Sequence, residues 1–277
     1  MEKPTLLAIF AHPDDEAFGT GGSLSRYAAS GAQVALICAT RGEVGEISDS
    51  SFATPETLGE VRESELRCAA ETMGVNELIF LDYRDSGMVG TPENDDPRAF
   101  INAPAGEVVR SLVSAIRRIR PDVVVTFEPN GGYGHPDHIA IHKHTVAAFH
   151  AAADPAYHAP GGPWQAARLF YTAIPRSFFL EMRRQLQEAG EDVEQFASFE
   201  ERGWPDEQVT VTLDVSATVA DKWQALNCHR TQFGPKNLFR RLPEPAVMQL
   251  MSREHFALAW PESAPGFKMA DLFEGLS

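Results

Sequence analysis

The stretch LLAIFAHPDDE, residues 6–16, passes from a short apolar run directly into a turn with one imidazole and three carboxylates. Its apolar part is the first of several short strands that the pattern predicts, at 6–11, 34–39, 78–81 and 123–127. Between them, apolar residues recur at helical spacing over 60–73 and 106–119. Strands that alternate with helices are typical of βαβ units. The predicted fold class is therefore α/β, a Rossmann-like, mostly parallel sheet flanked by helices.

A segment rich in proline and glycine, 154–163, separates this part from a less regular one. The later part is predicted to hold strands at 169–174 and 209–214 and helices at 178–188 and 219–230. We therefore expect a catalytic core at 1–160 and a smaller C-terminal α/β subdomain at 161–277 that completes the pocket, or one continuous domain. The acidic stretch 188–207 is expected to be a solvated loop.

The composition argues against several classes of protein. With 24 Lys+Arg against 39 Asp+Glu, the 277-residue chain carries a formal charge of −15, which repels nucleic-acid phosphates and anionic membranes. Its apolar runs are too short to span a bilayer and no signal-peptide pattern is present, so we expect a cytoplasmic protein without membrane partners. The scattered cysteines, Cys38, Cys68 and Cys228, are expected to be buried free thiols.

A second His-Pro-Asp turn, 135–138, follows the strand 123–127 and a glycine-rich turn. Because the carboxyl ends of parallel strands lie on one edge of a sheet, the two turns are expected to meet. Imidazoles with a carboxylate suit zinc or, less selectively, iron. The spacing predicts a mononuclear metal site but does not choose among His135, His138 and His142.

Two other functions are compatible with an α/β chain of this kind. A dinucleotide site needs glycines directly after the first strand, whereas this turn is filled with negative charge. A non-catalytic, metal-stabilised carbohydrate-binding protein is the alternative from another class.

Several motifs together carry a resemblance to a known family. They are AHPDDE at 11–16, GTGG at 19–22, GEVGE at 42–46, RDSGM at 84–88, PNGGYGHPDH at 129–138, and a weaker pattern of Lys222, Ala225, His229 and Gln232. The chain resembles, over nearly its whole length, the PIG-L/LmbE family of zinc-dependent de-N-acetylases. The motifs at 84–88 and 129–138 are similar to those of its mycothiol branch, which contains a GlcNAc-inositol deacetylase and an S-conjugate amidase.

The resemblance implies roles for individual residues. The metal ligands would be His12, Asp15 and His138, and the general base would be Asp14. A protein that only binds a carbohydrate would not need such a carboxylate outside the ligand set, so the resemblance favours hydrolysis over binding alone. Tyr133 and a protonated His135 would stabilise the oxyanion and protonate the amine, with Asp137 holding that imidazole and raising its pKa. The sugar would be bound by Arg62, Asp85 and Met88.

The implied activity is removal of an N-acetyl group from a small GlcNAc-containing molecule, such as a thiol-precursor glycoside, by zinc-activated water. An alternative is an amidase that cleaves a larger amide of a thiol S-conjugate. The resemblance also implies a homo-oligomer, and it does not separate zinc from iron as the native metal.

Overall fold

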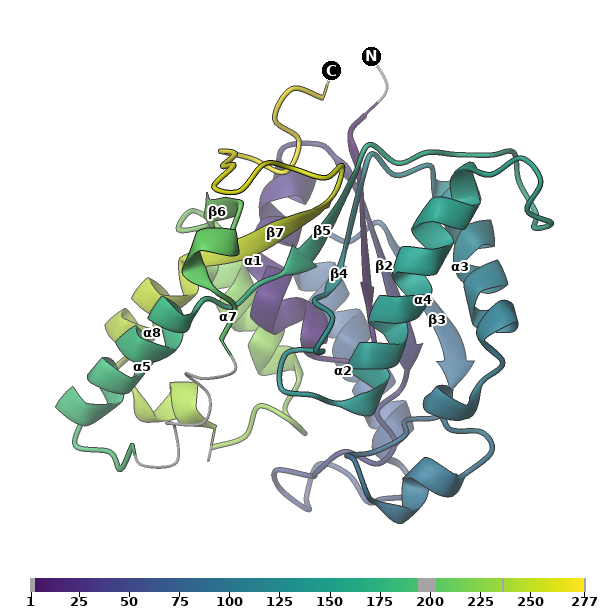
Figure 1. The fold of residues 1–277 in the computed structure, drawn as a ribbon. Helices are drawn as coiled ribbons and strands as arrows, with labels where there is room; N and C mark the ends of the chain where they lie inside the picture. Colours follow the sequence, from purple (N-terminus) through teal and green to yellow (C-terminus); the bar gives the residue numbers. More distant parts are fainter. Residues whose placement is uncertain (1–2, 194–202, 236, 277) are drawn as a thin grey trace.

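Seven strands form one sheet in the computed structural model, which describes residues 3–193, 203–235 and 237–276. The strand order is β3-β2-β1-β4-β5-β7-β6 (Figure 1). The strands are β1 Thr5–Phe10, β2 Gln33–Thr40, β3 Glu77–Tyr83, β4 Val123–Phe127, β5 Arg168–Thr172, β6 Val211–Asp214 and β7 Arg253–Trp260. Strands β1 to β5 are parallel, and β7 is antiparallel to both of its neighbours. The predicted α/β class with a mostly parallel sheet is confirmed.

Helices cover both faces of the sheet (Figure 1). They are α1 Asp15–Ala29, α2 Leu58–Thr72, α3 Ala105–Ile119, α4 Pro136–Ala153, α5 Arg176–Glu188, α7 Val219–Cys228 and α8 Glu244–Met251. Alternate residues of β1 face opposite cores: Leu6 packs with α1, α2 and α7, whereas Leu7 packs with α3 and α4. Within the described residues, no helix has the length and apolar character needed to cross a membrane.

The four early strands and two early helices lie where the periodicity predicts them, within three residues at each end. Helix α8 and strand β7 were not predicted. Strand β7 nevertheless lies inside the sheet, between β5 and β6. Residues 154–163, which directly follow α4, form neither helix nor strand, as expected. Of the acidic stretch 188–207, residues 194–202 lie outside the described residues.

The sheet runs without interruption across the predicted division at residue 160, because β5 pairs with β4 along five residues. Strands on both sides of the division therefore share one set of backbone hydrogen bonds. The division into two subdomains stays a prediction.

The expectation of three free thiols is wrong. Cys68 on α2 and Cys228 at the end of α7 form a disulfide, with their Cα atoms 5.8 Å apart, and Cys38 alone is a buried free thiol. The two bonded residues are 160 positions apart in the chain. They meet because α2 packs against α7, a contact that no spacing rule in the sequence signals.

Candidate metal centre and active site

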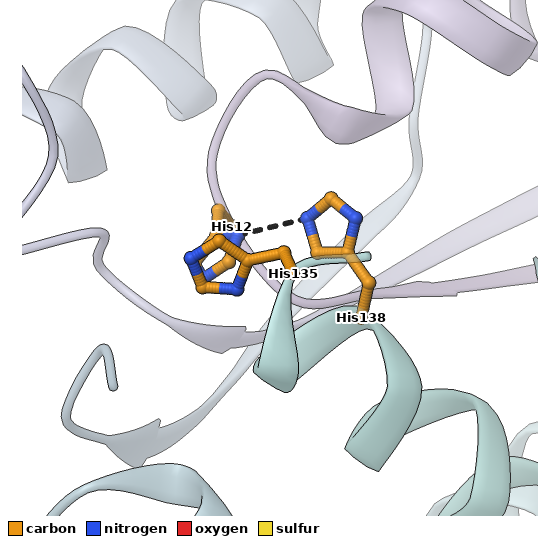
Figure 2. A group of neighbouring side chains, drawn as sticks. All are labelled: His12, His135 and His138. Atoms are coloured by element: carbon orange, nitrogen blue, oxygen red, sulfur yellow. Dashed lines mark hydrogen bonds between the residues drawn. The ribbon is translucent and has the colours of Figure 1, made fainter. Parts of the chain in front are cut away.

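The two His-Pro-Asp turns lie side by side at the carboxyl ends of β1 and β4 (Figure 2). His12 follows β1, while His135 caps α4 and His138 lies in its first turn. Since β1 and β4 are adjacent and parallel, their following residues reach the same point. His12 Nδ1 and His138 Nε2 face each other at 3.1 Å.

The remaining hydrogen bonds of these two rings decide their tautomers. His138 Nδ1 lies 3.1 Å from the carbonyl of Gly131, which can only accept, so this nitrogen donates. His12 Nε2 likewise donates to the Asp137 carboxylate at 3.1 Å. In neutral rings, the two nitrogens that face each other therefore both carry lone pairs.

Asp15 adds a third acceptor at the same point. Its Oδ1 lies 3.2 Å from His138 Nε2, and its Oδ2 lies 3.7 Å from His12 Nδ1. Three acceptors without a donor between them require a cation or an extra proton. Burial opposes a charge on His12, but Asp85, Asp137 and Asp15 outweigh it and raise its pKa well above the usual range. The same field favours a metal cation.

The spacing of these three potential ligand atoms fits a divalent ion. Tetrahedral zinc, with bonds of about 2.0–2.2 Å, places its ligand atoms about 3.3–3.6 Å apart. The two imidazole nitrogens lie 3.1 Å apart, and the nearest Asp15 oxygens lie 3.2 Å from His138 (Oδ1) and 3.7 Å from His12 (Oδ2), all close to that range. Both imidazoles also donate their other N–H to a carboxylate or carbonyl, as ligating histidines usually do.

Two compact groups of buried side chains among the described residues could hold an ion, and both contain His12: one with His135 and His138, the other with Asp85 and Asp137. His135 is the weaker ligand, because its Nδ1 already accepts the Asp137 N–H at 3.2 Å. Its Nε2 then carries the proton of the neutral ring. His12, Asp15 and His138 therefore stay the predicted ligand set, with His135 as a hydrogen-bond donor.

His142, the other histidine that the spacing left open, lies outside this cluster. Its Nδ1 is 2.8 Å from the carbonyl of Phe127, and its ring packs edge-on against Tyr171.

Asp14 has its side chain beside the cluster but makes none of the contacts among the three acceptors. Its carboxylate lies 3.5 Å from Arg62 Nη2. Burial raises the pKa of Asp14 to about 6, against the opposing charge of Arg62 and with help from Asp15. A carboxylate with a pKa near neutrality suits proton transfer at physiological pH.

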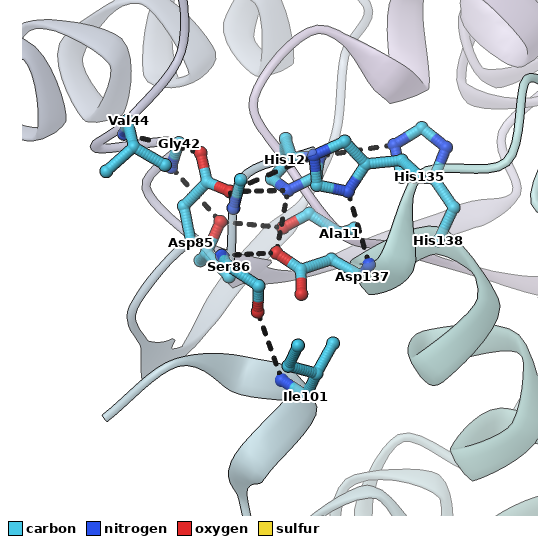
Figure 3. Close-up of polar contacts among 12 residues, drawn as sticks. Ala11, His12, Gly42, Val44, Asp85, Ser86, Ile101, His135, Asp137 and His138 are labelled. Atoms are coloured by element: carbon cyan, nitrogen blue, oxygen red, sulfur yellow. Dashed lines mark hydrogen bonds and ion pairs between the residues drawn. The ribbon is translucent and has the colours of Figure 1, made fainter. Parts of the chain in front are cut away.

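The carboxylate of Asp137 does not hold the His135 ring, contrary to expectation, and only the backbone N–H of Asp137 bonds that ring. Its Oδ2 accepts from His12 Nε2 and, at 2.9 Å, from the backbone N–H of Ser86 (Figure 3). The backbone at the start of α4 directs the Asp137 carboxylate toward His12 and away from His135. The charge of Asp137 does act to raise the pKa of His135, but burial and the imidazoles of His12 and His138 outweigh it and lower that pKa to about 4.

The three residues expected at the sugar differ in their surroundings. Asp85 is buried, 3.5 Å from His12 Nε2, and accepts the Gly87 N–H at 2.9 Å. Arg62 is buried too and donates to the carbonyls of Gly42 and Pro13, at 2.9 and 2.6 Å. Its guanidinium is therefore held inside the protein rather than exposed on the surface of the helix. Met88 is about half exposed, at 46%.

Tyr133 lies on the glycine-rich turn, with its ring edge-on to that of His138 at a centroid distance of 5.0 Å. Gly131, Gly132 and Gly134 all have positive φ, which explains the run of glycines around it. The tyrosine is 47% exposed and borders a cavity of about 490 Å³.

This cavity opens from the cluster of His12, Asp15 and His138 toward the C-terminal part of the chain. Asp15, His138 and Tyr133 line one end. The apolar side chains that line the rest are Phe18, Phe127, Ile174, Phe178, Phe179, Met182, Trp204, Leu238, Phe239, Leu250 and Met251. Most of its wall is therefore supplied by residues after 160.

Comparison with known proteins now adds to the geometry. The model of the family described as GlcNAc-PI de-N-acetylase, PIG-L, matches residues 7–149, which include both turns. The chain belongs to the PIG-L family. It is 40% identical to the 1D-myo-inositol 2-acetamido-2-deoxy-alpha-D-glucopyranoside deacetylase of Geodermatophilus obscurus, over 98% of this chain and 97% of the relative. PIG-L proteins are de-N-acetylases, and hence hydrolases.

Solved structures with this fold are not all deacetylases. The N,N'-diacetylchitobiose deacetylase of Pyrococcus horikoshii has a TM-score of 0.65 and 19% identity, covering 100% of this chain and 87% of that one. GalB, a 4-carboxy-2-hydroxymuconate hydratase from Pseudomonas putida, has a TM-score of 0.62 and 16% identity, with 94% and 98% covered. The PIG-L assignment therefore rests on sequence, since the fold alone accommodates two reactions.

Two residues near the PIG-L motif were not assigned a role from sequence. Glu16 is buried and bonds His229 at 2.7 Å, although the two are 213 positions apart. Ser86 supplies its backbone N–H to Asp137. Both residues lie inside motifs, AHPDDE and RDSGM, which could have marked them as functional. Their partners, His229 and Asp137, lie in distant segments and could not be predicted from the spacing.

Proposed function

We propose that this PIG-L protein removes the N-acetyl group from a GlcNAc-inositol or a related thiol-precursor glycoside. The observation that carries the proposal is the convergence of three acceptors, from His12, Asp15 and His138, beside the carboxylate of Asp14. The names of relatives about 40% identical over nearly the whole chain support the glycoside as substrate.

The proposed metal is Zn²⁺, with Fe²⁺ as the alternative, held by His12, Asp15 and His138. When bound, such an ion would act as a Lewis acid toward the amide carbonyl and lower the pKa of a coordinated water. Asp137 would keep the ring of His12 oriented through its Nε2–H.

The protein's own groups would then manage the protons. Asp14 would take a proton from the attacking water, for which its raised pKa is suited. The Nε2–H of His135 and the hydroxyl of Tyr133 would donate hydrogen bonds to the oxygen that gains charge. Asp14 would then return the proton of the water to the departing amine, because a neutral His135 ring has no second proton to give. Arg62, Asp85 and Met88 are proposed to border the sugar.

A second candidate is cleavage of a larger amide, as in a thiol S-conjugate. The largely apolar cavity beside Asp15 and His138 favours this amidase activity. An acetyl group is small and a sugar is polar, so a larger apolar acyl group would fill such a cavity better.

The test is a panel of GlcNAc derivatives that differ only in the aglycone, together with GlcN amides of longer acyl groups, assayed for free amine. Turnover of GlcNAc-inositol above all others supports the deacetylase, and a preference for large apolar acyl groups supports the amidase. Prolonged chelation followed by zinc or iron addition tests the metal. Equal turnover of metal-free protein would contradict the proposal.

The partners and location are also proposals. A small-molecule substrate without nucleic-acid or membrane partners agrees with the charge of −15. A cytoplasmic location and a homo-oligomeric state stay predictions. Fractionation of the native cells tests the location. The Cys68–Cys228 disulfide argues against the cytoplasm, since disulfides are more common in oxidising compartments. Light scattering of the purified protein tests the second.

A further inference from the structure

Asp14 has a backbone conformation that residues other than glycine rarely adopt, with φ 112° and ψ −26°. Such a residue keeps this conformation only where its surroundings hold it. Its N–H donates to Glu16 Oε2 at 3.0 Å. The side chain of Glu16 therefore fixes the peptide that aims the Asp14 carboxylate.

Glu16 is itself held from a distant part of the chain. It is 1% exposed, and its Oε1 lies 2.7 Å from Nε2 of His229, which is fully buried. A third buried carboxylate beside Asp14 and Asp15 is costly unless a donor compensates it. His229 supplies that donor.

The position of His229 is set by the end of α7. Its N–H donates to the carbonyl of Leu226, and its own carbonyl accepts from Gln232. The preceding residue, Cys228, is bonded to Cys68 on α2. These contacts hold His229 in place, and its Nε2 in turn orients the Glu16 carboxylate.

The metal ligand next to Asp14 has separate support. Asp15 Oδ2 accepts the backbone N–H groups of His12 and Ala11, at 2.7 and 3.2 Å. Neither bond involves Glu16 or His229. Loss of the Glu16–His229 contact should therefore displace Asp14 and leave the ligand set in place.

We propose that Glu16 and His229 are positioning residues that hold Asp14 in its left-handed conformation and so aim the general base. This rests on the proposed function, in which Asp14 takes the proton. It gives a role to the C-terminal motif of Lys222, Ala225, His229 and Gln232, of which His229 is the member that reaches the catalytic turn.

The test compares two amides at position 229. In His229→Gln the side-chain amide can occupy the place of Nε2 and still donate to Glu16, whereas in His229→Asn it is too short. For GlcNAc-inositol we expect kcat to stay within about threefold of wild type in the Gln variant. In the Asn variant it should fall about 10²-fold, the cost of a catalytic group displaced by about 1 Å. KM and metal content should be unchanged in both.

Ser25→Ala is the matched control. It removes another hydrogen bond between α1 and α7, from Ser25 Oγ to Asp221 at 2.6 Å, far along α1 from Asp14. Its kcat should equal that of wild type. Glu16→Ala removes the carboxylate that accepts from both His229 and the Asp14 N–H, and it should lower kcat as much as His229→Asn does. This second variant keeps the test valid if His229→Asn fails to fold.

A crystal structure of His229→Asn provides a readout that does not need activity, and the φ of Asp14 should leave the positive region there. Equal kcat in the Gln and Asn variants, or an unchanged Asp14 backbone, would overturn the proposal. If wild type turns over no GlcNAc compound, the proposed function fails, while the crystallographic comparison still decides this inference.

Discussion

Two neighbouring aspartates in one turn differ in what surrounds them. Asp15 faces two imidazoles, whose charge and hydrogen bonds hold its pKa far below the usual range although burial alone would raise it. Burial raises the pKa of Asp14 instead. The two carboxylates are thereby suited to different tasks, one as a permanently ionised ligand and the other as a base.

Asp14→Asn should retain the metal and lose turnover. Asparagine tolerates positive φ better than alanine does, so it suits a position at φ 112°. We expect kcat to fall about 10²–10⁴-fold, the usual contribution of a general base. Metal analysis and steady-state kinetics on GlcNAc-inositol measure this. Normal turnover would remove Asp14 as the base, and loss of metal would place it among the ligands.

His12→Ala or His138→Ala should lose both the metal and turnover, because each removes one of three converging acceptors. His142→Ala is the control, since His142 lies on the same helix as His138 but bonds the carbonyl of Phe127. Elemental analysis after dialysis should find metal in the control alone. Full metal occupancy in His138→Ala would exclude it as a ligand.

Among the elements, α2 and α7 matter most to the site, because they carry Arg62 and lead into His229. The disulfide between Cys68 and Cys228 joins them. A cross-link between residues 160 positions apart restricts the unfolded chain strongly.

The double variant Cys68→Ala, Cys228→Ala should therefore be less stable than wild type by about 2–5 kcal/mol. Urea unfolding measures the difference. A reducing agent should lower the stability of wild type by a similar amount and leave the double variant unchanged. Three free thiols in denatured, unreduced wild type would show that the bond does not form.

For the whole molecule, the sheet is the feature that joins the two halves of the chain. Strand β4 is hydrogen-bonded to β1 on one side and to β5 on the other. Its residues Val123 to Val125 are buried, at most 1% exposed. Cutting the chain at 160 would turn this strand into an exposed apolar edge.

A fragment of residues 1–160 should therefore aggregate or unfold without a cooperative transition, since bare apolar edge strands pair with other chains. Size-exclusion chromatography and thermal unfolding followed by circular dichroism test this. A monomeric fragment with a sharp transition would instead support the division at 160.

Local patterns were sufficient for much of the fold and for part of the site. Short apolar runs and helical spacing depend on neighbouring residues, and so the strands 6–11 and 123–127 and the helix 106–119 could be predicted. The convergence of the two His-Pro-Asp turns also followed, because adjacent parallel strands end on one edge. Strand β7 could not be placed, since its partners β5 and β6 come from distant segments.

By itself, then, the sequence determined the α/β class, the PIG-L motifs and the turns that carry His12 and His138. Only the tertiary structure decided that Asp137 bonds His12 rather than His135, that Cys68 pairs with Cys228, and that His229 reaches Glu16. The physical reason is that side-chain contacts depend on direction and on distance through space. Residues as far as 213 positions apart in the chain leave no local pattern that records them.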